Sequence, residues 1–389
     1  MGTGPARGDS RSLHGGRRRP RADGAPAGTG PGRLVGGGRS GAVKVRGEGS
    51  LDRRSFLGKG FLLPFSLALP ASCGREGRLS LRRTFKALGT EARILLEGTS
   101  RGALEKAAQA VEGAFRKGEA LLSPFLPGSA LSRLCREAGR RTVPLGPVLG
   151  ELIGASRRAW ERTAGAFDPT VAPLVRAFRL NSGGRIPTKE EFLQARERVG
   201  MGRLEWDPVE GRIRFPGPGY GLDPCGVGKG LVLDLAVRAA RDAGAAAGLL
   251  EAGGDLIAFG PTLFPVGLRV KGIPGGVAAL FPLGERALAA SGLLERVVRA
   301  GRRELGHVLD PRTGEPLDPE DPAVPLTAAA AAPTGAEADA LATGLLVLGK
   351  EGLAALEKVP GADGLLVLRD GKEGFRLERT RGFPVYRKT

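Results

Sequence analysis

The sequence predicts an α+β fold in which helices pack against a mainly antiparallel sheet. Two long segments, 100–122 and 147–162, repeat apolar residues at helical spacing, whereas residues 246–330 have the pattern of short strands separated by turns. Strands and helices are mixed along the 389 residues without the strict alternation that a parallel sheet requires, and no internal repeat is present. These observations favour an α+β architecture with a mainly antiparallel sheet.

The first half of the predicted fold contains one strand and three helices. Residues 85–97 have the β-branched and apolar content of a strand. The segment 100–122 follows as a helix with a serine at its N-cap, and a second helix spans about 147–162. A Thr-Lys-Glu-Glu capping box at 188–191 predicts a third helix that runs to Val199.

The second half contains a hairpin, several short strands and three helices. A hairpin is predicted at 203–215, and a Gly-rich turn at 226–230 leads into a helix that ends at Ala243. Beyond the short strands, helical spacing predicts a helix over about 336–348. A shorter helix at 351–358 and an exposed hairpin complete the chain.

The chain is predicted to have three parts. Residues 1–50 are rich in Gly, Arg, Ser and Pro without periodicity, and we expect this head to be disordered. Residues 51–81 combine paired arginines, a short apolar run and a small-residue end, which predicts a twin-arginine export signal rather than an incidental apolar segment. Cys73 is placed like the cysteine of a lipoprotein, so residues 82–389 would be exported to the periplasmic side of the cytoplasmic membrane and anchored there by lipid.

The high net charge does not predict a nucleic-acid partner. The chain carries a net charge of +18, but residues 1–83 hold 17 basic and 5 acidic residues, which leaves a modest excess over the rest. Aromatic residues make up only 5%, too few for a surface that stacks bases. No segment reaches 18 consecutive apolar residues, so no membrane-spanning helix is expected either.

Cysteine and histidine are rare enough to exclude two classes of site. The three cysteines are Cys73, Cys135 and Cys225, and the two histidines are His14 and His307. Their spacings match neither a zinc finger nor a disulfide framework. Any imidazole chemistry in the folded part therefore depends on His307.

A Gly-rich turn at 222–230 has the composition of a phosphate-binding loop. It places bare backbone and Lys229 at the N-terminus of a predicted helix, where amide groups bind anions. It is not a Walker A loop, because Gly230 stands where that loop needs Ser or Thr. A plain turn that starts a helix is the alternative interpretation.

Asp339 and Thr343 lie four residues apart on a predicted helix and so share one face. A carboxylate and a hydroxyl side by side suit Mg²⁺, which prefers hard oxygen ligands and completes its shell with water and phosphate. The alternative is a solvated helix face.

His307 ends a predicted strand and could act as a general base, or it could be a packing residue. Asp168 and Asp255 lie in tight turns that they could simply cap.

Eight segments with these residues follow one another in a fixed order. They are Leu88-Gly89-Thr90, 123–134, Phe167-Asp168-Pro169-Thr170, 222–234, Gly253-Gly254-Asp255, Ser291-Gly292, 307–314 and 338–343. Together they resemble the motifs of the ApbE family of flavin transferases. The resemblance implies an ApbE-like, T-fold-related α+β domain over 82–389.

The resemblance also implies an activity and a set of site residues. It implies a Mg²⁺-dependent enzyme that cleaves FAD and transfers FMN, through a phosphoester bond, to a threonine of an acceptor flavoprotein with release of AMP. His307 and Lys229 would be catalytic. The implied Mg²⁺ ligands are the main-chain carbonyls of Gly228 and Ala342, the Asp339 carboxylate and the Thr343 hydroxyl. The implied flavin contacts are Leu88, Ala166, Phe167, Asp168, Asp223, Cys225, Leu231, Gly254, Asp255 and Ser291.

Two other functions stay open at this point. Water could replace the threonine, which would make the protein a hydrolase that converts FAD to FMN and AMP, or the protein could bind FAD in the periplasm without chemistry. Cys225 stands where the family usually has Gly, and Glu251 where it has Asn or Ser. A disulfide between Cys135 and Cys225 also stays open.

Overall fold

The structure, a computed structural model, describes residues 1, 43–44, 65–67, 78–270, 277–371 and 374–383. The chain divides into two units, residues 1–40 and 41–389, and every described helix and strand belongs to the second. The predicted disordered head and most of the predicted export signal, Cys73 included, lie outside the described residues. None of the described helices combines the length and the apolar content needed to cross a membrane.

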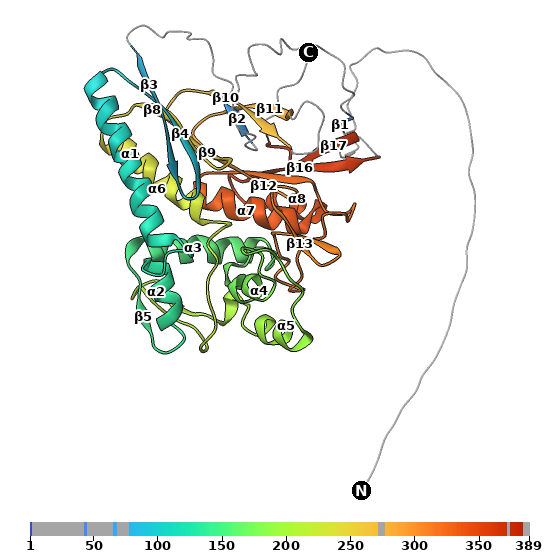
Figure 1. Ribbon diagram of the computed structural model, residues 1–389. Helices are drawn as coiled ribbons and strands as arrows, with labels where there is room; N and C mark the ends of the chain where they lie inside the picture. The colour runs from blue at the N-terminus through green and yellow to red at the C-terminus, as the bar shows by residue number, and fades with distance from the viewer. Residues whose placement is uncertain (2–42, 45–64, 68–77, 271–276, 372–373, 384–389) are drawn as a thin grey trace, which may run out of the picture. The chain divides into compact units, whose positions relative to one another are not determined.

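A nine-stranded sheet in which all neighbouring strands are antiparallel forms the centre of this unit (Figure 1). Its strands, in spatial order, are β1 (Val43–Lys44), β17 (Gly374–Arg379), β16 (Asp363–Asp370), β15 (Thr327–Ala332), β12 (Ala287–Gly292), β9 (Asp255–Phe259), β8 (Ala247–Ala252), β4 (Thr90–Gly98) and β3 (Leu79–Ala87). The mixed helix and antiparallel sheet architecture confirms the predicted fold class.

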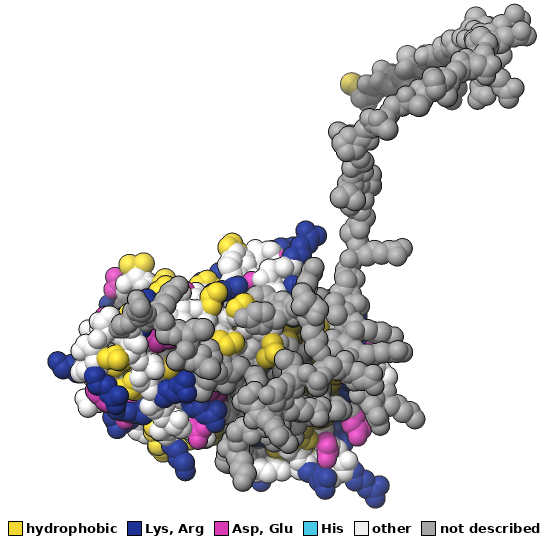
Figure 2. Space-filling view, turned by 90° about the horizontal axis from the view of Figure 1, so that it is seen from above, with side chains coloured by type: hydrophobic (Ala, Val, Ile, Leu, Met, Phe, Trp, Pro, Cys, Tyr) yellow, Lys and Arg dark blue, Asp and Glu magenta, His cyan; other side chains and the backbone are white. Residues whose placement is uncertain are grey.

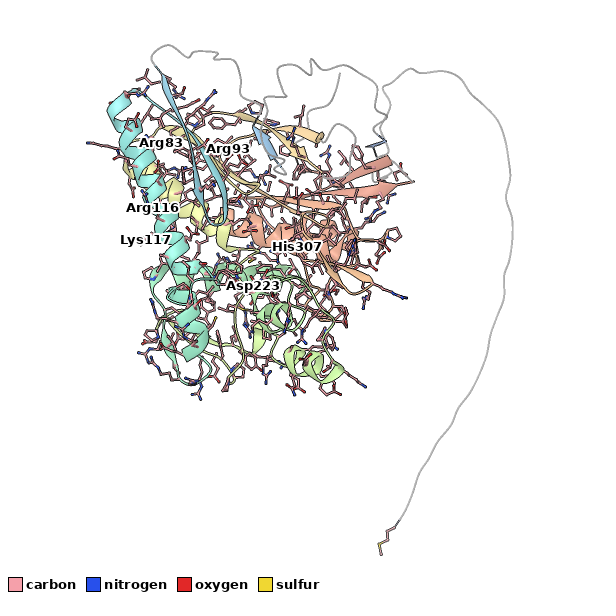
Figure 3. The ribbon with its side chains drawn as sticks, viewed as in Figure 1. Arg83, Arg93, Arg116, Lys117, Asp223 and His307 are labelled. Atoms are coloured by element: carbon pink, nitrogen blue, oxygen red, sulfur yellow. The ribbon has the colours of Figure 1, made fainter. Side chains whose placement is uncertain are left out.

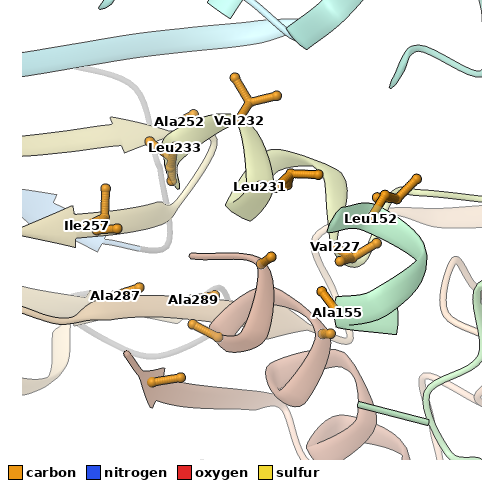
Figure 4. Close-up of a cluster of buried hydrophobic side chains, with 14 of the residues drawn as sticks. Leu152, Ala155, Val227, Leu231, Val232, Leu233, Ala252, Ile257, Ala287 and Ala289 are labelled. Carbon is orange, nitrogen blue, oxygen red and sulfur yellow. The ribbon is translucent and has the colours of Figure 1, made fainter. Parts of the chain in front are cut away.

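Helices cover one face of this sheet and a small sheet covers the other. Helices α1 (Arg101–Leu122), α6 (Gly228–Asp242) and α7 (Gly335–Leu348) pack side by side against the strands, and α3 (Pro147–Arg162) packs on α7 (Figure 1). The apolar side chains of this helical layer form the largest core, part of which is shown in Figure 4. The opposite face carries a second core beneath the three-stranded sheet of β2 (Phe65–Leu67), β10 (Phe264–Arg269) and β11 (Val277–Leu283).

This layered arrangement explains why several central strands are apolar throughout. Every residue of β8, β9 and β15 is buried, and β15 is a threonine followed by five alanines. A strand covered on both faces has no solvent-facing side, so its residues do not alternate between polar and apolar. The small alanines of β15 let α7 approach the sheet closely.

A third, smaller core supports the loop that carries His307. It lies between α4 (Ala172–Ala177), α5 (Lys189–Arg196) and a two-stranded hairpin of β13 (Val297–Ala300) and β14 (Arg303–Gly306). The remaining described elements are α2 (Ala130–Glu137), α8 (Lys350–Leu356), the 3-10 turns Pro169–Val171 and Met201–Arg203, and a three-stranded sheet of β5 (Val143–Pro144), β7 (Arg212–Arg214) and β6 (Glu205–Asp207).

Basic and acidic side chains of the folded unit are mixed rather than segregated. Arg83, for example, forms ion pairs with Glu105 at 2.6 Å and with Glu112 at 2.9 Å. On the face shown in Figure 2, Lys and Arg side chains lie among Asp and Glu side chains. The surface that is visible there agrees with the modest excess of positive charge outside the first 83 residues.

The predicted strand at 85–97 is wrong in one respect, because the chain reverses within it. Leu88 and Gly89 form the two-residue turn between β3 and β4, in which Ala87 pairs with Thr90. Both turn residues have positive φ, 54° for Leu88 and 71° for Gly89, as two-residue hairpin turns require. A leucine in this conformation gives no turn signal in the sequence, whereas a glycine alone is ambiguous.

Other boundaries differ in smaller ways. The helix at 147–162 and the hairpin within 203–215 are confirmed, but α5 ends at Arg196 instead of Val199, and α2 was not predicted. The terminal hairpin is not exposed throughout, because β16 lies between β15 and β17 and its central residues are buried. Strand β3 already begins at Leu79, three residues before the predicted domain start.

Candidate active site

A cavity of about 630 Å³ opens between the helical layer and the loops at one end of the sheet. Eight separate parts of the chain line it: the β3–β4 turn, the end of α1 with the loop that follows it, the 166–175 segment, the loop before α6 with the start of that helix, the β8–β9 turn, the segment 290–295, the loop after β14, and the middle of α7. The predicted site residues that line it are Leu88, Ala166, Phe167, Asp168, Asp223, Cys225, Gly228, Lys229, Ser291, His307, Asp339 and Thr343. Most of the residues that the motifs predicted are thus brought to one place.

The close crossing of α6 and α7 positions the charged part of this cavity. A Cβ atom at Gly230 would lie 2.0 Å from the carbonyl oxygen of Gly335, so only glycine permits this approach. Asp234, one turn further along α6, accepts hydrogen bonds from the backbone N–H groups of Gly335 at 2.6 Å and Ala336 at 2.9 Å. It therefore satisfies two free amides at the start of α7 and holds that helix against α6.

This crossing places one lysine between two buried carboxylates. Lys229 Nζ lies 2.6 Å from Asp255 Oδ2 and 3.6 Å from Asp339 Oδ1. Asp339 Oδ2 also accepts a hydrogen bond from the backbone N–H of Gly230 at 3.2 Å. Asp255 and Asp339 are each 3% exposed, so their negative charges are shielded mainly by Lys229 and not by water.

The ionisation of the cluster follows from this burial. Burial and the neighbouring Asp255 raise the pKa of Asp339 to about 7, although Lys229 acts in the opposite direction. Burial also raises the pKa of Asp255, against the pull of Lys229. Burial opposes the charge of Lys229, but the two carboxylates outweigh it and raise the pKa of its ammonium group. Two carboxylates facing one ammonium leave a deficit of positive charge that a bound cation would fill.

The oxygen donors beside this cluster suit Mg²⁺. Thr343 lies one turn after Asp339 on α7, and its hydroxyl donates to the Asp339 main-chain carbonyl at 3.2 Å and contacts Ser291 Oγ at 3.1 Å. A Cβ at Gly226 would lie 2.8 Å from Thr343 Oγ1, so the α6 loop can approach this hydroxyl only as backbone. A carboxylate, a hydroxyl and nearby carbonyls are hard oxygen ligands of the kind that Mg²⁺ prefers.

The same residues define what kind of metal site this can be. Among the residues that the structure describes, no group of three or more His, Cys, Asp or Glu side chains could hold a metal ion. A cation here would depend on Asp339, the Thr343 hydroxyl, main-chain carbonyls such as those of Gly228 and Ala342, and oxygens of a ligand. Such a site fits Mg²⁺, which usually binds few protein side chains together with phosphate oxygens.

His307 is neutral and has a defined hydrogen bond. Its Nδ1 lies 3.0 Å from the main-chain carbonyl oxygen of Arg296, to which only an N–H can donate, so Nε2 keeps its lone pair. Burial lowers the pKa of the imidazole, and the positive charges of Arg296 and Lys229 lower it further. Figure 3 shows His307 and Asp223, the latter in the loop before α6. An unprotonated Nε2 has the properties of a general base.

Two predicted flavin contacts, Asp168 and Asp223, have carboxylates that accept hydrogen bonds from neighbouring residues of the protein. Asp168 Oδ1 accepts hydrogen bonds from the backbone N–H of Thr170 at 2.8 Å and from its hydroxyl at 2.5 Å, and Oδ2 accepts one from Met201 N–H at 2.8 Å. Burial raises the pKa of Asp168, and these bonds lower it. Asp223 Oδ1 accepts from the Cys225 N–H at 2.9 Å. Both residues line the cavity, but their carboxylates shape its loops.

Four predicted residues do not line the cavity. Leu231 lies in the main core with Leu152 and Val227 (Figure 4), and it borders a second cavity instead. Ala342 is fully buried within α7, and Gly254 lies in the β8–β9 turn with φ 95°. Asp255 forms an ion pair with Lys229, which does line the cavity, so Asp255 influences the charge of the cavity through the lysine.

Sequence reasoning did not select two apolar residues at the cavity. Phe125 and Leu126 follow α1, line the cavity and are 64% and 46% exposed. Large apolar side chains so exposed beside a cavity are unusual on a soluble surface and favour contact with an apolar ligand. Both residues lie within the motif segment 123–134, but their exposure is a tertiary property, so the sequence did not single them out as site residues.

The two described cysteines do not form a disulfide. Cys135 and Cys225 are both free thiols. The Cys135 sulfur accepts a hydrogen bond from Leu222 N–H at 3.4 Å, and burial raises its pKa. Cys225 lines the cavity, and burial together with Asp223 raises the pKa of its thiol, so it stays protonated at neutral pH.

Comparison with known proteins identifies the family. The profile of the ApbE family matches residues 88–366, a span that contains every residue discussed above for the cavity. The chain belongs to the ApbE family. This membership confirms the resemblance drawn from the eight ordered segments.

Several family members align over most of this chain. The FAD:protein FMN transferase of Klebsiella pneumoniae (strain 342) is 26% identical over 318 residues, which cover 77% of this chain and 87% of that protein. A protein of the same name from Rhodobacter capsulatus is 27% identical and covers 88% of this chain and 67% of its own length.

Solved structures of the family have the same fold. The ApbE protein of Thermotoga maritima superposes with a TM-score of 0.68 at 26% identity, over 78% of this chain and 97% of its own. The flavin transferase ApbE of Vibrio cholerae gives the same TM-score at 20% identity, over 79% and 98%. The ApbE architecture is therefore that of this chain.

Proposed function

We propose that this protein is a Mg²⁺-dependent FAD:protein FMN transferase, which moves FMN from FAD onto a threonine of an acceptor flavoprotein and releases AMP. The observation that carries the proposal is the Lys229–Asp255–Asp339 cluster beside the Thr343 hydroxyl, in one cavity with the neutral His307. Relatives named for this activity align over the same part of the chain. Phosphoryl transfer needs mainly positioning and charge neutralisation, and this cavity supplies both.

The cavity has separate regions for the two parts of FAD. Exposed Phe125 and Leu126 and buried Phe167 line the cavity and provide apolar surface for an aromatic ring system. The start of α6, with the ammonium group of Lys229, is placed for the pyrophosphate. A volume of about 630 Å³ lies within the usual range for small-molecule sites.

The reaction exchanges one phosphorus–oxygen bond for another. The threonine oxygen of the acceptor bonds to the phosphorus of the FMN part, and the bond from that phosphorus to the bridging oxygen breaks, so AMP leaves with that oxygen. Nε2 of His307 accepts the threonine proton. Lys229 stabilises charge on the phosphate oxygens. A Mg²⁺ ion bound by Asp339, Thr343 and nearby carbonyls would supply the remaining neutralisation of the pyrophosphate.

We propose further that the chain is exported and anchored at Cys73 on the periplasmic side of the membrane. Support comes from the pattern of residues 51–81, most of which lie outside the described residues. Strand β2 lies within that segment and pairs with β10, so cleavage before Cys73 would remove β2 from the mature protein. Mass spectrometry of the membrane fraction would test this, since an unmodified, uncleaved chain would contradict it.

The activity is tested by incubating the full chain with FAD, MgCl₂ and a flavoprotein domain that carries a candidate threonine. The expected result is an acceptor whose mass increases by one FMN moiety, on that threonine, together with an equal amount of AMP. Free FMN and AMP in the presence of several acceptors would instead indicate FAD hydrolysis. Bound FAD that stays intact would indicate a carrier, and either result would contradict the transferase.

A further inference from the structure

The hairpin of β13 and β14 carries His307 at its open end. Val297 pairs with Gly306, so Arg296 and His307 are the residues just outside the last pair of the ladder. The chain on both sides of His307 is tied to Leu317: Gly306 N–H donates to the Leu317 carbonyl and Leu317 N–H donates to the Val308 carbonyl, each at 2.9 Å. The backbone of His307 is therefore held, and what remains to be set is the rotation and the tautomer of its ring.

Within the described part of the chain, the hydrogen-bond partner of the imidazole is the main-chain carbonyl of Arg296. His307 Nδ1 lies 3.0 Å from this oxygen. A carbonyl accepts and does not donate, so the contact selects the tautomer with the proton on Nδ1 and leaves Nε2 as the acceptor. In the other tautomer two lone pairs would face each other, and Nε2 would carry a proton and could not accept one.

The side chain of Arg296 anchors that carbonyl to a different part of the fold. Its guanidinium donates from Nη2 to the main-chain carbonyl of Leu180 at 2.5 Å and to the side-chain oxygen of Asn181. Leu180 is 1% exposed and belongs to the third core, between α4 and α5. Arg296 thus joins the hairpin to the buried segment that follows α4.

The hairpin needs such an anchor because it is small. It has two strands of four residues each, paired only with each other. An isolated two-stranded hairpin is marginally stable, so its position depends on contacts to the rest of the protein. Ala300, at the far end of the hairpin, and Leu305, which pairs with Val298 beside the last pair of the ladder, supply apolar contacts in the third core. At the end that carries His307, the Arg296 guanidinium makes the hydrogen bonds to the segment after α4.

We infer that Arg296 is a positioning residue for His307: its guanidinium fixes the main-chain carbonyl that imposes the Nδ1–H tautomer and directs Nε2 for proton acceptance. The inference rests on the proposed function for its catalytic consequence, but the tautomer is a property of the protein without substrate. Arg296 itself need not touch the reacting atoms. Arg303, at the other end of β14, is exposed and lacks this anchor, which makes it a matched control.

The test is a nitrogen NMR measurement on the full chain labelled with ¹⁵N-histidine. The chain has only two histidines, so the spectrum shows two imidazoles. A variant of the R303Q protein in which His307 is also replaced loses one set of signals, and this loss assigns that set to His307. In the wild type we expect His307 as the Nδ1–H tautomer. In R296Q we expect a shift toward the Nε2–H form. In R296K we expect part of the Nδ1–H form to be retained, because the lysine ammonium can still donate to the Leu180 carbonyl. In R303Q we expect no change.

Kinetics provide the second measurement. R296Q should lower kcat by about tenfold and leave KM for FAD within about twofold, since a misdirected base affects the chemical step and not FAD binding. Wild-type His307 as the Nε2–H form, an unchanged tautomer in R296Q, or an equal shift in R303Q would overturn the inference. If R296Q does not fold, R296K and Asn181→Ala decide it by the same spectrum. Failure of FMN transfer in the wild type, with the tautomer as expected, would overturn the proposed function and not this contact.

Discussion

Lys229 Nζ lies 2.6 Å from Asp255 Oδ2 on β9 and 3.6 Å from Asp339 Oδ1 on α7, so one lysine on α6 links the central sheet to the second helix of the site. Both carboxylates are buried, and Lys229 supplies the positive charge that faces them. The cluster therefore has a structural and a chemical consequence, and the two can be measured separately.

Replacing Asp339 by Ala should abolish Mg²⁺-dependent FMN transfer. The change removes the only carboxylate that shares a helix face with Thr343. Loss of a group of this kind typically slows a reaction by about 10²–10⁴-fold. Initial rates over a series of MgCl₂ concentrations measure the effect, with exposed Asp242→Asn on α6 as the control. Transfer at the wild-type rate would rule out Asp339 as a ligand.

Replacing Lys229 by Met should destabilise the fold. It leaves Asp255 and Asp339 facing each other without a positive charge, and breaking a buried ion pair typically costs about 3–5 kcal/mol. Urea unfolding gives the free energy. The double variant K229M/D255N removes one of the repelling charges and should recover part of the loss. A double variant less stable than K229M would contradict this account.

Glu251 should make stability fall as the pH rises. Its carboxylate is 2% exposed, lies 3.8 Å from Arg93 (labelled in Figure 3) and has no hydrogen-bond partner in the described part of the chain. Burial raises its pKa from 4.5 to about 7, although Arg93 opposes the shift. Folding therefore favours the protonated form of Glu251. Its contribution to the free energy of unfolding is fully present below pH 4.5, and about 3 kcal/mol of it is lost as the pH rises through 7.

The variant E251Q isolates this group from the other buried carboxylates. Glutamine keeps the shape without the charge, so E251Q should be more stable than the wild type above pH 7 and lose less stability between pH 5 and 8. Thermal unfolding across that pH range measures both chains, with exposed Glu320→Gln as control. Parallel curves for the wild type and E251Q would show that Glu251 is ionised in the folded protein.

Replacing Gly230 by Ala should destabilise the α6–α7 crossing and reduce activity. The new methyl group would meet the Gly335 carbonyl at 2.0 Å, so the helices must separate, and overpacking of this kind typically costs about 1–3 kcal/mol. Gly113→Ala on α1 is the matched control, since no atom lies within 4 Å of the new group. It should stabilise the helix by about 0.5–1 kcal/mol. Equal effects of the two changes on unfolding would contradict the role of the crossing.

The pH dependence of transfer should report the neutral His307. Burial and nearby positive charges lower the pKa of this imidazole below its ordinary value of 6.5, so the base stays competent at mildly acidic pH. At MgCl₂ concentrations that keep Asp339 ionised by bound Mg²⁺, we expect kcat to fall only below pH 6.5 as His307 becomes protonated. His307→Asn should reduce kcat by about 10²–10⁴-fold and remove this limb of the profile. An acid limb that persists in the variant would assign it to another group.

Much of the site was accessible from local sequence patterns. The pair Asp339 and Thr343 was predicted on one helix face, and the Gly-rich turn before Lys229 was predicted at the start of a helix, as the structure has them. The use of Asp168 as a turn cap was among the alternatives, whereas Asp223 was expected only as a flavin contact, and Asp255 was expected only to cap a turn or to contact flavin. Its pairing with Lys229 was not predicted, because the two residues lie on different elements.

From the sequence alone, one could determine the helices, the fold class and the order of the motifs, because helical periodicity, capping and turn chemistry depend on residues a few positions apart. Tertiary structure decided the β3–β4 turn at Leu88, the exposure of Phe125, the charge balance around Lys229 and the tautomer of His307. These properties depend on burial and on contacts between distant segments, which determine the solvation and the hydrogen-bond partners of each group. Local sequence patterns can therefore indicate residues of the site, whereas the ionisation of these residues and the orientation of their side chains depend on the fold.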